Sequence, residues 1–377
     1  MSTFTRHPWT RWAVPAVAVV AVGAATGIAT VSADASTPLA PRTAEQLLVD
    51  LQGATPTGLS GTVVQTSDLG IPSVPGLPSG GGGIGASSDL MSMLSGTHTL
   101  RVWYGGPGQT RVALLGSLGE SDVIHNGQDV WVWSSRDKSG THYTVPTDTG
   151  RTKEAPDVTQ APLTPDAAAK QALAALDPTT KVTTEGTAKI AGHSAYELVL
   201  APRDPASLVA EVRIAVDSVT HIPLRVEVFS TKASKPAFQV GFTQVDFAKP
   251  EARQFSFKAP PGTTVKQGST PNPATPSGAT KALDPPASAP KIVGKGWTTV
   301  AVVTLPKDST TATPNASGRA GLGSLQAITK ALPAVSGAWG AGHLFSGTLV
   351  SAVLTDDGRV AVGAVTPELL YAALTAK

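Results

Sequence analysis

The amino-acid sequence predicts an α+β protein: a large, curved antiparallel sheet forming an unclosed β-barrel, helices over its concave face, and a small C-terminal α+β domain. Three observations lead to this fold class. Short β-rich runs separated by turn signals follow one another from about residue 59 to residue 257, which is typical of an antiparallel sheet. Two helical patterns accompany these runs. A stretch rich in Pro, Thr, Ser and Ala then separates a second, smaller group of strands.

The first segment of the chain has the features of a secretory signal peptide over residues 1–35. Arg6 and Arg11 precede an uncharged apolar stretch at 12–31, and Ala33-Asp34-Ala35 forms a small-x-small cleavage site. An apolar stretch of roughly 20 residues is also long enough for a retained membrane anchor. In both cases the rest of the chain is expected outside the cytoplasmic membrane, as a secreted or cell-envelope protein.

Two helices are expected beside the sheet. Thr43 begins a capping box, and the apolar spacing that follows predicts an amphipathic helix ending at Gly53. Thr164 is the expected N-cap of a second helix, with Pro165 in its first turn and Asp177-Pro178 at its end. The inner stripes of both helices consist mainly of Ala and Leu.

Twelve strands are expected between the first helix and residue 258. They cover 60–66, 97–104, 109–115, 121–125, 129–134, 142–145, 182–190, 193–200, 208–216, 223–231, 238–247 and 254–257. Asn126-Gly127 predicts a tight hairpin between two of them. In the run 238–247 the apolar residues change from even to odd positions, which predicts a β-bulge.

The remaining segments divide the chain into parts. Residues 36–258 form the half-barrel domain, with a Gly/Pro-rich insertion at 67–96 that either packs back onto the domain or forms a hydrophobic flap over an opening. Residues 259–291 are the expected linker. Residues 292–377 form the small α+β domain, with strands at 297–305, 344–354 and 359–365 in a three-stranded sheet, and helices at about 324–332 and after Thr366.

Composition excludes several classes of protein. With 29 Lys and Arg against 27 Asp and Glu, the net charge is +2, so the chain lacks the strong positive charge of a nucleic-acid-binding protein. The absence of cysteine excludes disulfides, thiolate metal sites and cysteine nucleophiles.

Catalytic motifs are also missing from the sequence. It contains no H-E-x-x-H, no G-x-S-x-G and no complete phosphate-binding loop, and its seven histidines are dispersed. We therefore expect no enzyme activity, no catalytic residues, no cofactor and no metal site.

The pattern of apolar residues leaves two interpretations of the inner face of the sheet. Several strands alternate between apolar and charged positions, as in Val212, Ile214 and Val216 against Arg213 and Asp217. The helices and the insertion either fill this face completely, which gives an ordinary core, or leave an apolar cavity that accepts an acyl chain.

A group of motifs resembles the LolA-like superfamily, in particular an actinobacterial branch related to the sigma-factor regulators RseB and MucB. These motifs are Leu59-Ser60-Gly61-Thr62-Val63-Val64, Asp129-Val130-Trp131-Val132-Trp133, Ala195-Tyr196-Glu197-Leu198, Ile214-Ala215-Val216-Asp217 with Ile222-Pro223-Leu224-Arg225-Val226, and Phe255-Ser256-Phe257-Lys258-Ala259-Pro260-Pro261-Gly262. The resemblance covers about residues 42–265. The small domain, with Gly296-Trp297-Thr298 and Asp357-Gly358-Arg359, resembles the second domain of RseB.

The resemblance implies a hydrophobic cavity for acyl chains, with the helices as its lid. It therefore implies an exported, non-enzymatic protein that binds lipids or lipoproteins. The alternative it implies is an RseB-like envelope sensor, whose small domain contacts a membrane-bound anti-sigma factor. The chain departs from the lipid carriers in lacking a lipobox cysteine and an alignable cavity arginine.

Candidate cavity residues follow from this arrangement. They are Leu47, Leu51, Val102, Trp131, Trp133, Leu173, Leu176, Tyr196, Ile214, Val226, Phe238 and Phe242. In the insertion, Ile71, Leu77, Met91 and Met93 are the candidate flap residues.

Overall fold

The computed structural model describes residues 39–70, 95–116, 119–145, 164–174, 176–268, 290–304 and 332–376. Apart from Leu39 and Ala40, these residues belong to one compact unit, Pro41–Lys377. Within the described ranges, no helix combines the length and the apolar character needed to cross a membrane. The expected signal peptide or anchor at 1–35 lies outside the described residues, as does nearly all of the expected helix at 324–332.

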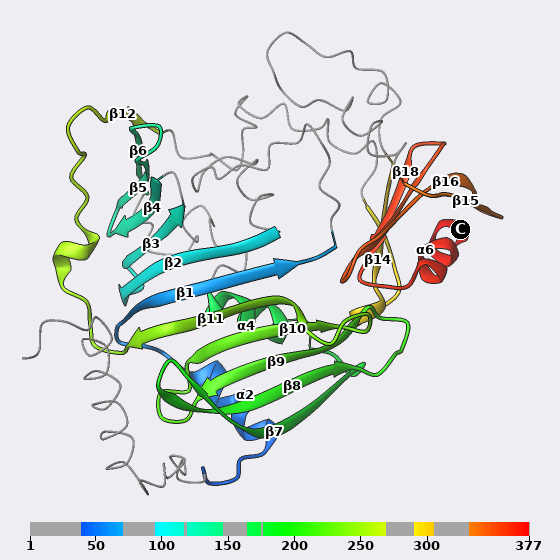
Figure 1. Ribbon diagram of the computed structural model, residues 1–377, viewed down its shortest axis with the longest axis horizontal. Coiled ribbons are helices and arrows are strands. Elements are labelled where there is room, and N and C mark those ends of the chain that lie inside the picture. The colour runs from blue at the N-terminus through cyan, green and yellow to red at the C-terminus, as the bar shows by residue number, and fades with distance from the viewer. Residues whose placement is uncertain are drawn as a thin grey trace, which may run out of the picture. The chain divides into compact units, whose positions relative to one another are not determined.

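A twelve-stranded open sheet dominates the fold (Figure 1). Its strands are β1 (Leu59–Asp68), β2 (Ser95–Gly106), β3 (Gln109–Gly116), β4 (Gly119–Asn126), β5 (Asp129–Ser134), β6 (Ser139–Thr144), β7 (Thr180–Ile190), β8 (His193–Pro202), β9 (Val209–Asp217), β10 (Pro223–Ser230), β11 (Pro236–Asp246) and β12 (Thr264–Gln267). Their order is β12-β6-β5-β4-β3-β2-β1-β11-β10-β9-β8-β7, so the sheet is not closed into a barrel. The predicted fold class is confirmed.

The strand predictions hold for β1 to β11 and fail after β11. Residues 254–257 do not form a strand, because Ala252–Phe255 is a short 3-10 helix, η1. Strand β12 lies inside the expected linker and pairs in parallel with β6. All four of its side chains are exposed, so no apolar alternation marks it in the sequence. The division of the chain at 258 and 291 stays a prediction.

Two helices pack against one face of the sheet, which we call the helix face. Helix α2 (Ala44–Gly53) contacts β7, and helix α4 (Pro165–Ala174) contacts β10 and β11. The predicted capping box of α2 is confirmed, because Thr43 accepts from the Gln46 amide and the Gln46 side chain accepts from the Thr43 amide. Thr164 caps α4 by accepting from the Ala167 amide at 3.2 Å.

The predicted β-bulge is confirmed in β11. Thr62 of β1 pairs with Gln244 and Val63 with Phe242, so Thr243 is the extra residue. Phe242 therefore stays on the helix face, while Gln244 and Asp246 turn to the other side. Gly61 is needed beside the bulge, since a Cβ there would lie 2.4 Å from the Gln244 carbonyl oxygen and 2.9 Å from the Phe242 ring.

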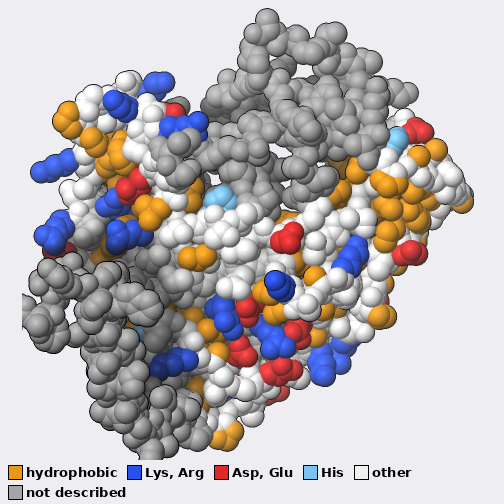
Figure 2. Space-filling model, viewed as in Figure 1, with side chains coloured by type: hydrophobic (Ala, Val, Ile, Leu, Met, Phe, Trp, Pro, Cys, Tyr) orange, Lys and Arg blue, Asp and Glu red, His pale blue; other side chains and the backbone are white. Residues whose placement is uncertain are grey.

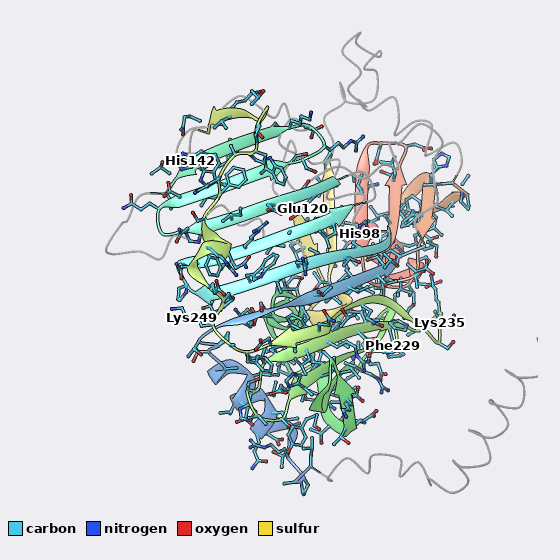
Figure 3. The ribbon with its side chains drawn as sticks, turned by 60° about the vertical axis from the view of Figure 1, so that its left-hand side comes forward. His98, Glu120, His142, Phe229, Lys235 and Lys249 are labelled. Carbon is cyan, nitrogen blue, oxygen red and sulfur yellow. The ribbon has the colours of Figure 1, made fainter. Side chains whose placement is uncertain are left out.

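The other face of the sheet, which we call the opposite face, is covered over β3 to β6 by the chain that follows β11 (Figure 3). Phe255 of η1 is buried there. The Phe257 ring lies 4.9 Å from the Trp131 ring and 6.0 Å from the Trp133 ring. Strand β5 is therefore apolar on both sides, and its two tryptophans belong to the opposite face.

The C-terminal part forms a second sheet, with six strands where three were expected. Its strands are β13 (Lys291–Val293), β14 (Val300–Thr304), β15 (Ala334–Gly337), β16 (Gly340–Ser346), β17 (Ser351–Thr355) and β18 (Arg359–Gly363), in the order β13-β14-β18-β17-β16-β15. A short 3-10 helix, η2 (Gly296–Thr298), precedes β14. The single strand expected at 344–354 is a hairpin, because the chain turns at 347–350. Helix α6 (Pro367–Thr375) packs against β14, β17 and β18.

Hydrogen bonds connect the two sheets within this unit. Ser207 forms an isolated bridge with Val365, and the Trp297 indole N–H donates to the Thr180 hydroxyl at 2.7 Å. The Ser230 hydroxyl donates to the Thr348 carbonyl at 2.6 Å. The second sheet is therefore attached at strand ends and turns of the first.

Candidate ligand-binding surface

The helix face of β8 to β11 is a continuous apolar layer. Cross-strand pairs join Leu198 to Ile214, Ile214 to Val226 and Val226 to Val240, so these side chains lie in one row on one face. Each of them is at most 1% exposed. From the helices, Leu47, Leu51, Ala168 and Ala169 are also buried.

The same face stays apolar beyond the strands that the helices contact. Across β2 to β5, the pairs Leu100–Leu114, Val102–Val112, Val112–Val123 and Val123–Val132 continue the layer. Leu100, Val102, Leu114, Val123 and Val130 are all less than 10% exposed. The principal contacts of α2 and α4 are with β7, β10 and β11. We call this part, the helix face of β2 to β5, the extended apolar surface.

Most of the candidate cavity residues share the helix face. Buried residues of the set on this face are Leu47, Leu51, Val102, Tyr196, Ile214, Val226 and Phe242. Phe238 is half-buried and pairs with Val228 on the same face. Leu173 is half-buried in α4, whereas Leu176 follows the end of the helix at Ala174 and is not part of its stripe.

Trp131 and Trp133 do not belong with this set, and this corrects the sequence-based expectation. Trp131 pairs with Ile124, Ile124 with Arg111, and Arg111 with Trp103, which places all four on the opposite face. Val102 precedes Trp103 in β2, and neighbouring residues of a strand point to opposite sides of the sheet. Val102 therefore lies on the helix face, whereas Trp131, which shares a face with Trp103, lies on the opposite face. The candidate flap residues Ile71, Leu77, Met91 and Met93 lie outside the described residues.

Several residues of the extended apolar surface were missed by sequence reasoning. Leu100, Leu114, Val123 and Val130 are as buried as the residues that were chosen. The signal was present in the alternation of Leu100, Val102 and Tyr104 in β2. Its assignment to one face required the register of the hairpins, which the turns at 107–108 and 127–128 determine.

The opposite face of β8 to β10 carries charged side chains that pair with one another (Figure 2). Arg225 pairs with Glu197 at 3.1 Å and with Glu227 at 3.2 Å. Arg213 pairs with Glu211 at 2.6 Å, and this hydrogen bond raises the pKa of Arg213 above its ordinary value. Burial raises the pKa of Glu227. The two faces of these strands therefore have opposite chemistry.

Metal-binding geometry is not found in the described part of the chain: no group of three His, Asp or Glu side chains there could hold a metal ion. The His142 ring stacks on Trp131 at 4.4 Å and its Nε2 lies 2.7 Å from the Asp129 Oδ1. His193 lies 3.5 Å from Asp217. His142 and His193 therefore each have a contact partner within the fold.

Of the comparisons with known proteins, only the one with solved structures found similar proteins. No protein-family model matches the chain, and no curated protein matches it. A complex of MucA and MucB from Pseudomonas aeruginosa is similar at 15% identity, with a TM-score of 0.40, over 88% of this chain and 96% of that chain. An uncharacterized conserved protein from Thermus thermophilus is similar at 13% identity, with a TM-score of 0.33, over 60% of this chain and 99% of that chain.

A LolA superfamily protein from Nitrosomonas europaea is also similar, at 11% identity and a TM-score of 0.23, over 58% of this chain and 99% of that chain. The solved structures that are similar to this chain thus include MucB and a LolA superfamily protein, the groups that the sequence motifs also resemble. The actinobacterial branch stays a prediction. Similarities at this level carry no argument about ligands, so the function has to be argued from the chain's own surfaces.

Proposed function

We propose that this protein is an extracytoplasmic, non-enzymatic binding protein that holds acyl chains of a lipid or lipoprotein against its helix face. The observation that supports this proposal is the extended apolar surface, which continues the core layer past the strands contacted by α2 and α4. Its buried side chains are less than 10% exposed, so an acyl chain has to replace the atoms that cover this layer. Once there, the acyl chain meets apolar contacts and no buried ion pair. Each buried CH₂ group of a ligand contributes about 0.8 kcal/mol, so a long acyl chain binds without a charged contact.

The direct test is to extract the purified protein with organic solvent and identify bound acyl species by mass spectrometry. Uptake of a fluorescent fatty acid is measured in parallel. Adjacent leucines of β3 give a matched pair of variants, because Leu114 is buried on the helix face and Leu115 is 38% exposed on the opposite face. Leu114→Gln should weaken uptake and Leu115→Gln should not. Absence of both acyl species and uptake in the folded wild type would refute the proposal.

The attachment of the second sheet favours a second candidate function, regulation through protein contact. The second sheet bonds to the ends of β9 and β10, where the Leu208 amide donates to the Ala364 carbonyl at 2.9 Å and Ser230 bonds Thr348. A ligand that shifts these strands would also shift the second sheet. In this alternative the chain is an envelope sensor, and its second sheet contacts a membrane-bound anti-sigma factor.

Substitutions on the exposed apolar residues of the second sheet separate the two functions. Ile292 is 59% exposed and Val350 is 36% exposed. Ile292→Glu and Val350→Glu should reduce capture of the anti-sigma factor's extracytoplasmic segment and leave fatty-acid uptake unchanged. Unchanged capture in both variants would count against a contact through this surface.

A further inference from the structure

A polar hollow of about 240 Å³ lies on the opposite face of the large sheet, across β11, β1 and β2. It is lined by Ser60, Gly61, Thr62, Arg101, Trp103, Gln244, Val245 and Asp246. This place is separate from the helix face, and nothing in the proposed acyl-binding function uses it.

The strand register explains the shape of the hollow. Ser60 pairs with Trp103 on one side and Asp246 on the other, and Thr62 pairs with Arg101 and Gln244. Short hydroxyl side chains thus form the floor on β1, between long side chains on both neighbouring strands. The result is a trough with Arg101 and Trp103 along one wall and Gln244 and Asp246 along the other.

The bulge at Thr243 positions the wall that Gln244 and Asp246 form. Without the extra residue, the alternation that places Val240 and Phe242 on the helix face would place Gln244 and Asp246 there too. The bulge turns both polar side chains to the side of Arg101 and Trp103. Bulges commonly re-aim side chains next to functional sites, so the wall is a specific feature of the strand.

Trp103, in the wall that it forms with Arg101, is held in position by a part-buried ion pair next to it. The Arg111 guanidinium lies over the Trp103 ring, 4.9 Å from its centroid. Arg111 in turn bonds Asp122 at 2.5 Å and Glu120, which Figure 3 labels, at 3.4 Å. The indole is therefore fixed before any ligand arrives, which lowers the entropy cost of binding.

Arg101 supplies the positive charge of the hollow. Its guanidinium lies 5.9 Å from the Trp103 ring centroid, and it forms no ion pair with any residue that the structure describes. The side chain is exposed, so its planar donor groups are accessible to a ligand from solvent.

We propose that this hollow binds a saccharide ring that carries a carboxylate group, such as a uronic acid. The carboxylate pairs with Arg101, because a guanidinium matches a carboxylate with two parallel hydrogen bonds. The C–H face of the sugar packs on the Trp103 indole. Its hydroxyl groups donate to Asp246 and exchange hydrogen bonds with Gln244, Ser60 and Thr62.

Other ligand classes fit this lining less well. An acyl chain would leave the polar lining groups without partners, which costs free energy at each group. A phosphate dianion is repelled by the Asp246 carboxylate more strongly than the single charge of a uronic acid is. The volume of about 240 Å³ lies below the roughly 300–1,000 Å³ of drug-sized sites, and thus suits one sugar unit.

The test is a titration of the purified protein with D-glucuronate, D-glucose, acetate and inorganic phosphate. Binding is followed by NMR through the Trp103 indole N–H signal, which Trp103→Phe identifies. Glucuronate should give a saturable shift, with an affinity about tenfold or more above those of glucose and acetate, as expected when the ring and the charge both contribute. Arg101→Gln and Gln244→Ala should each weaken glucuronate binding by about fivefold or more.

The matched control is Arg203→Gln, which removes an exposed arginine that does not line the hollow. It should leave the affinity for glucuronate unchanged. Lack of a saturable shift with glucuronate would overturn the proposal, as would equal affinities for glucuronate, acetate and phosphate, or equal losses in Arg101→Gln and Arg203→Gln. Fatty-acid uptake should be the same in Arg101→Gln and wild type, so failure here is distinguishable from failure of the acyl-binding function.

Discussion

Arg111 and Asp122 form an ion pair between neighbouring strands, with the Arg111 Nη2 atom 2.5 Å from the Asp122 Oδ2 atom. The Asp122 side chain is only 2% exposed. Its Oδ1 atom and the Nε atom of Arg111 have no hydrogen-bond partner among the described residues. Burial therefore outweighs the attraction of Arg111 and raises the pKa of Asp122 to about 7.

This raised pKa predicts a loss of stability with rising pH. A carboxyl group whose folded pKa exceeds its unfolded value stabilises the fold below about pH 4, and this contribution disappears as the pH rises through about 7. Asp122→Asn should remove this part of the pH dependence, which amounts to on the order of 2–4 kcal/mol. Urea unfolding from pH 4 to 8 measures it. Asp68→Asn, an exposed control, should keep the wild-type profile.

The helix α2 depends on one completely buried side chain. Leu47 is 0% exposed, whereas Val49 of the same helix is 69% exposed. Leu47→Ala should reduce the free energy of unfolding by about 2–5 kcal/mol because it leaves a cavity. Val49→Ala should change it by less than about 0.5 kcal/mol. Similar effects of the two substitutions in urea unfolding would show that α2 does not pack as described.

Gly61 should be intolerant of a side chain. A Cβ at this position would lie 2.4 Å from the Gln244 carbonyl oxygen, so Gly61→Ala has to displace β11 at the bulge. We expect a loss of about 1–3 kcal/mol, measured by thermal unfolding. Gly53→Ala is the control, since no atom lies within 4 Å of its added Cβ. A Gly61→Ala protein as stable as wild type would contradict the close approach.

Phe257 should shield the tryptophans of β5 from water. Its ring contacts those of Trp131 and Trp133 on the opposite face. Phe257→Ala should shift the tryptophan emission to longer wavelength and increase acrylamide quenching. Val265→Ala, in the exposed strand β12, should leave both unchanged. An unaltered spectrum of Phe257→Ala would mean that another group covers the tryptophans.

Local patterns predicted most of the large sheet. The Thr43 capping box, the Asn126-Gly127 turn and the change of apolar positions in β11 each identify one structure from a few neighbouring residues. Strand β12 could not be predicted in this way, because Thr264–Gln267 pairs through its backbone and buries no side chain. The hairpin at 347–350 was missed because β16 and β17 are both apolar.

The candidate site was predicted in part, for a different reason. Apolar character identified Ile214, Val226 and Phe242, but it could not separate Trp131 from them, because β5 is apolar on both sides. The separation depends on the register of seven neighbouring strand pairs between β5 and β9, and on η1 returning over β3 and β4. Such long-range arrangements leave no local signal. The polar hollow was missed because its residues come from three strands that are distant in sequence.

Strand β12 also determines how the sheet ends. It is four residues long, all four side chains are exposed, and one of them is Lys266. At the other end, β7 carries exposed Lys181 and Lys189, and its pairing with β8 is interrupted between Thr184 and Thr187. Short strands, lysines and interrupted ladders are the devices by which proteins prevent edge-to-edge aggregation. Both edges of this open sheet are thus protected against pairing with the edge of a second copy of the chain.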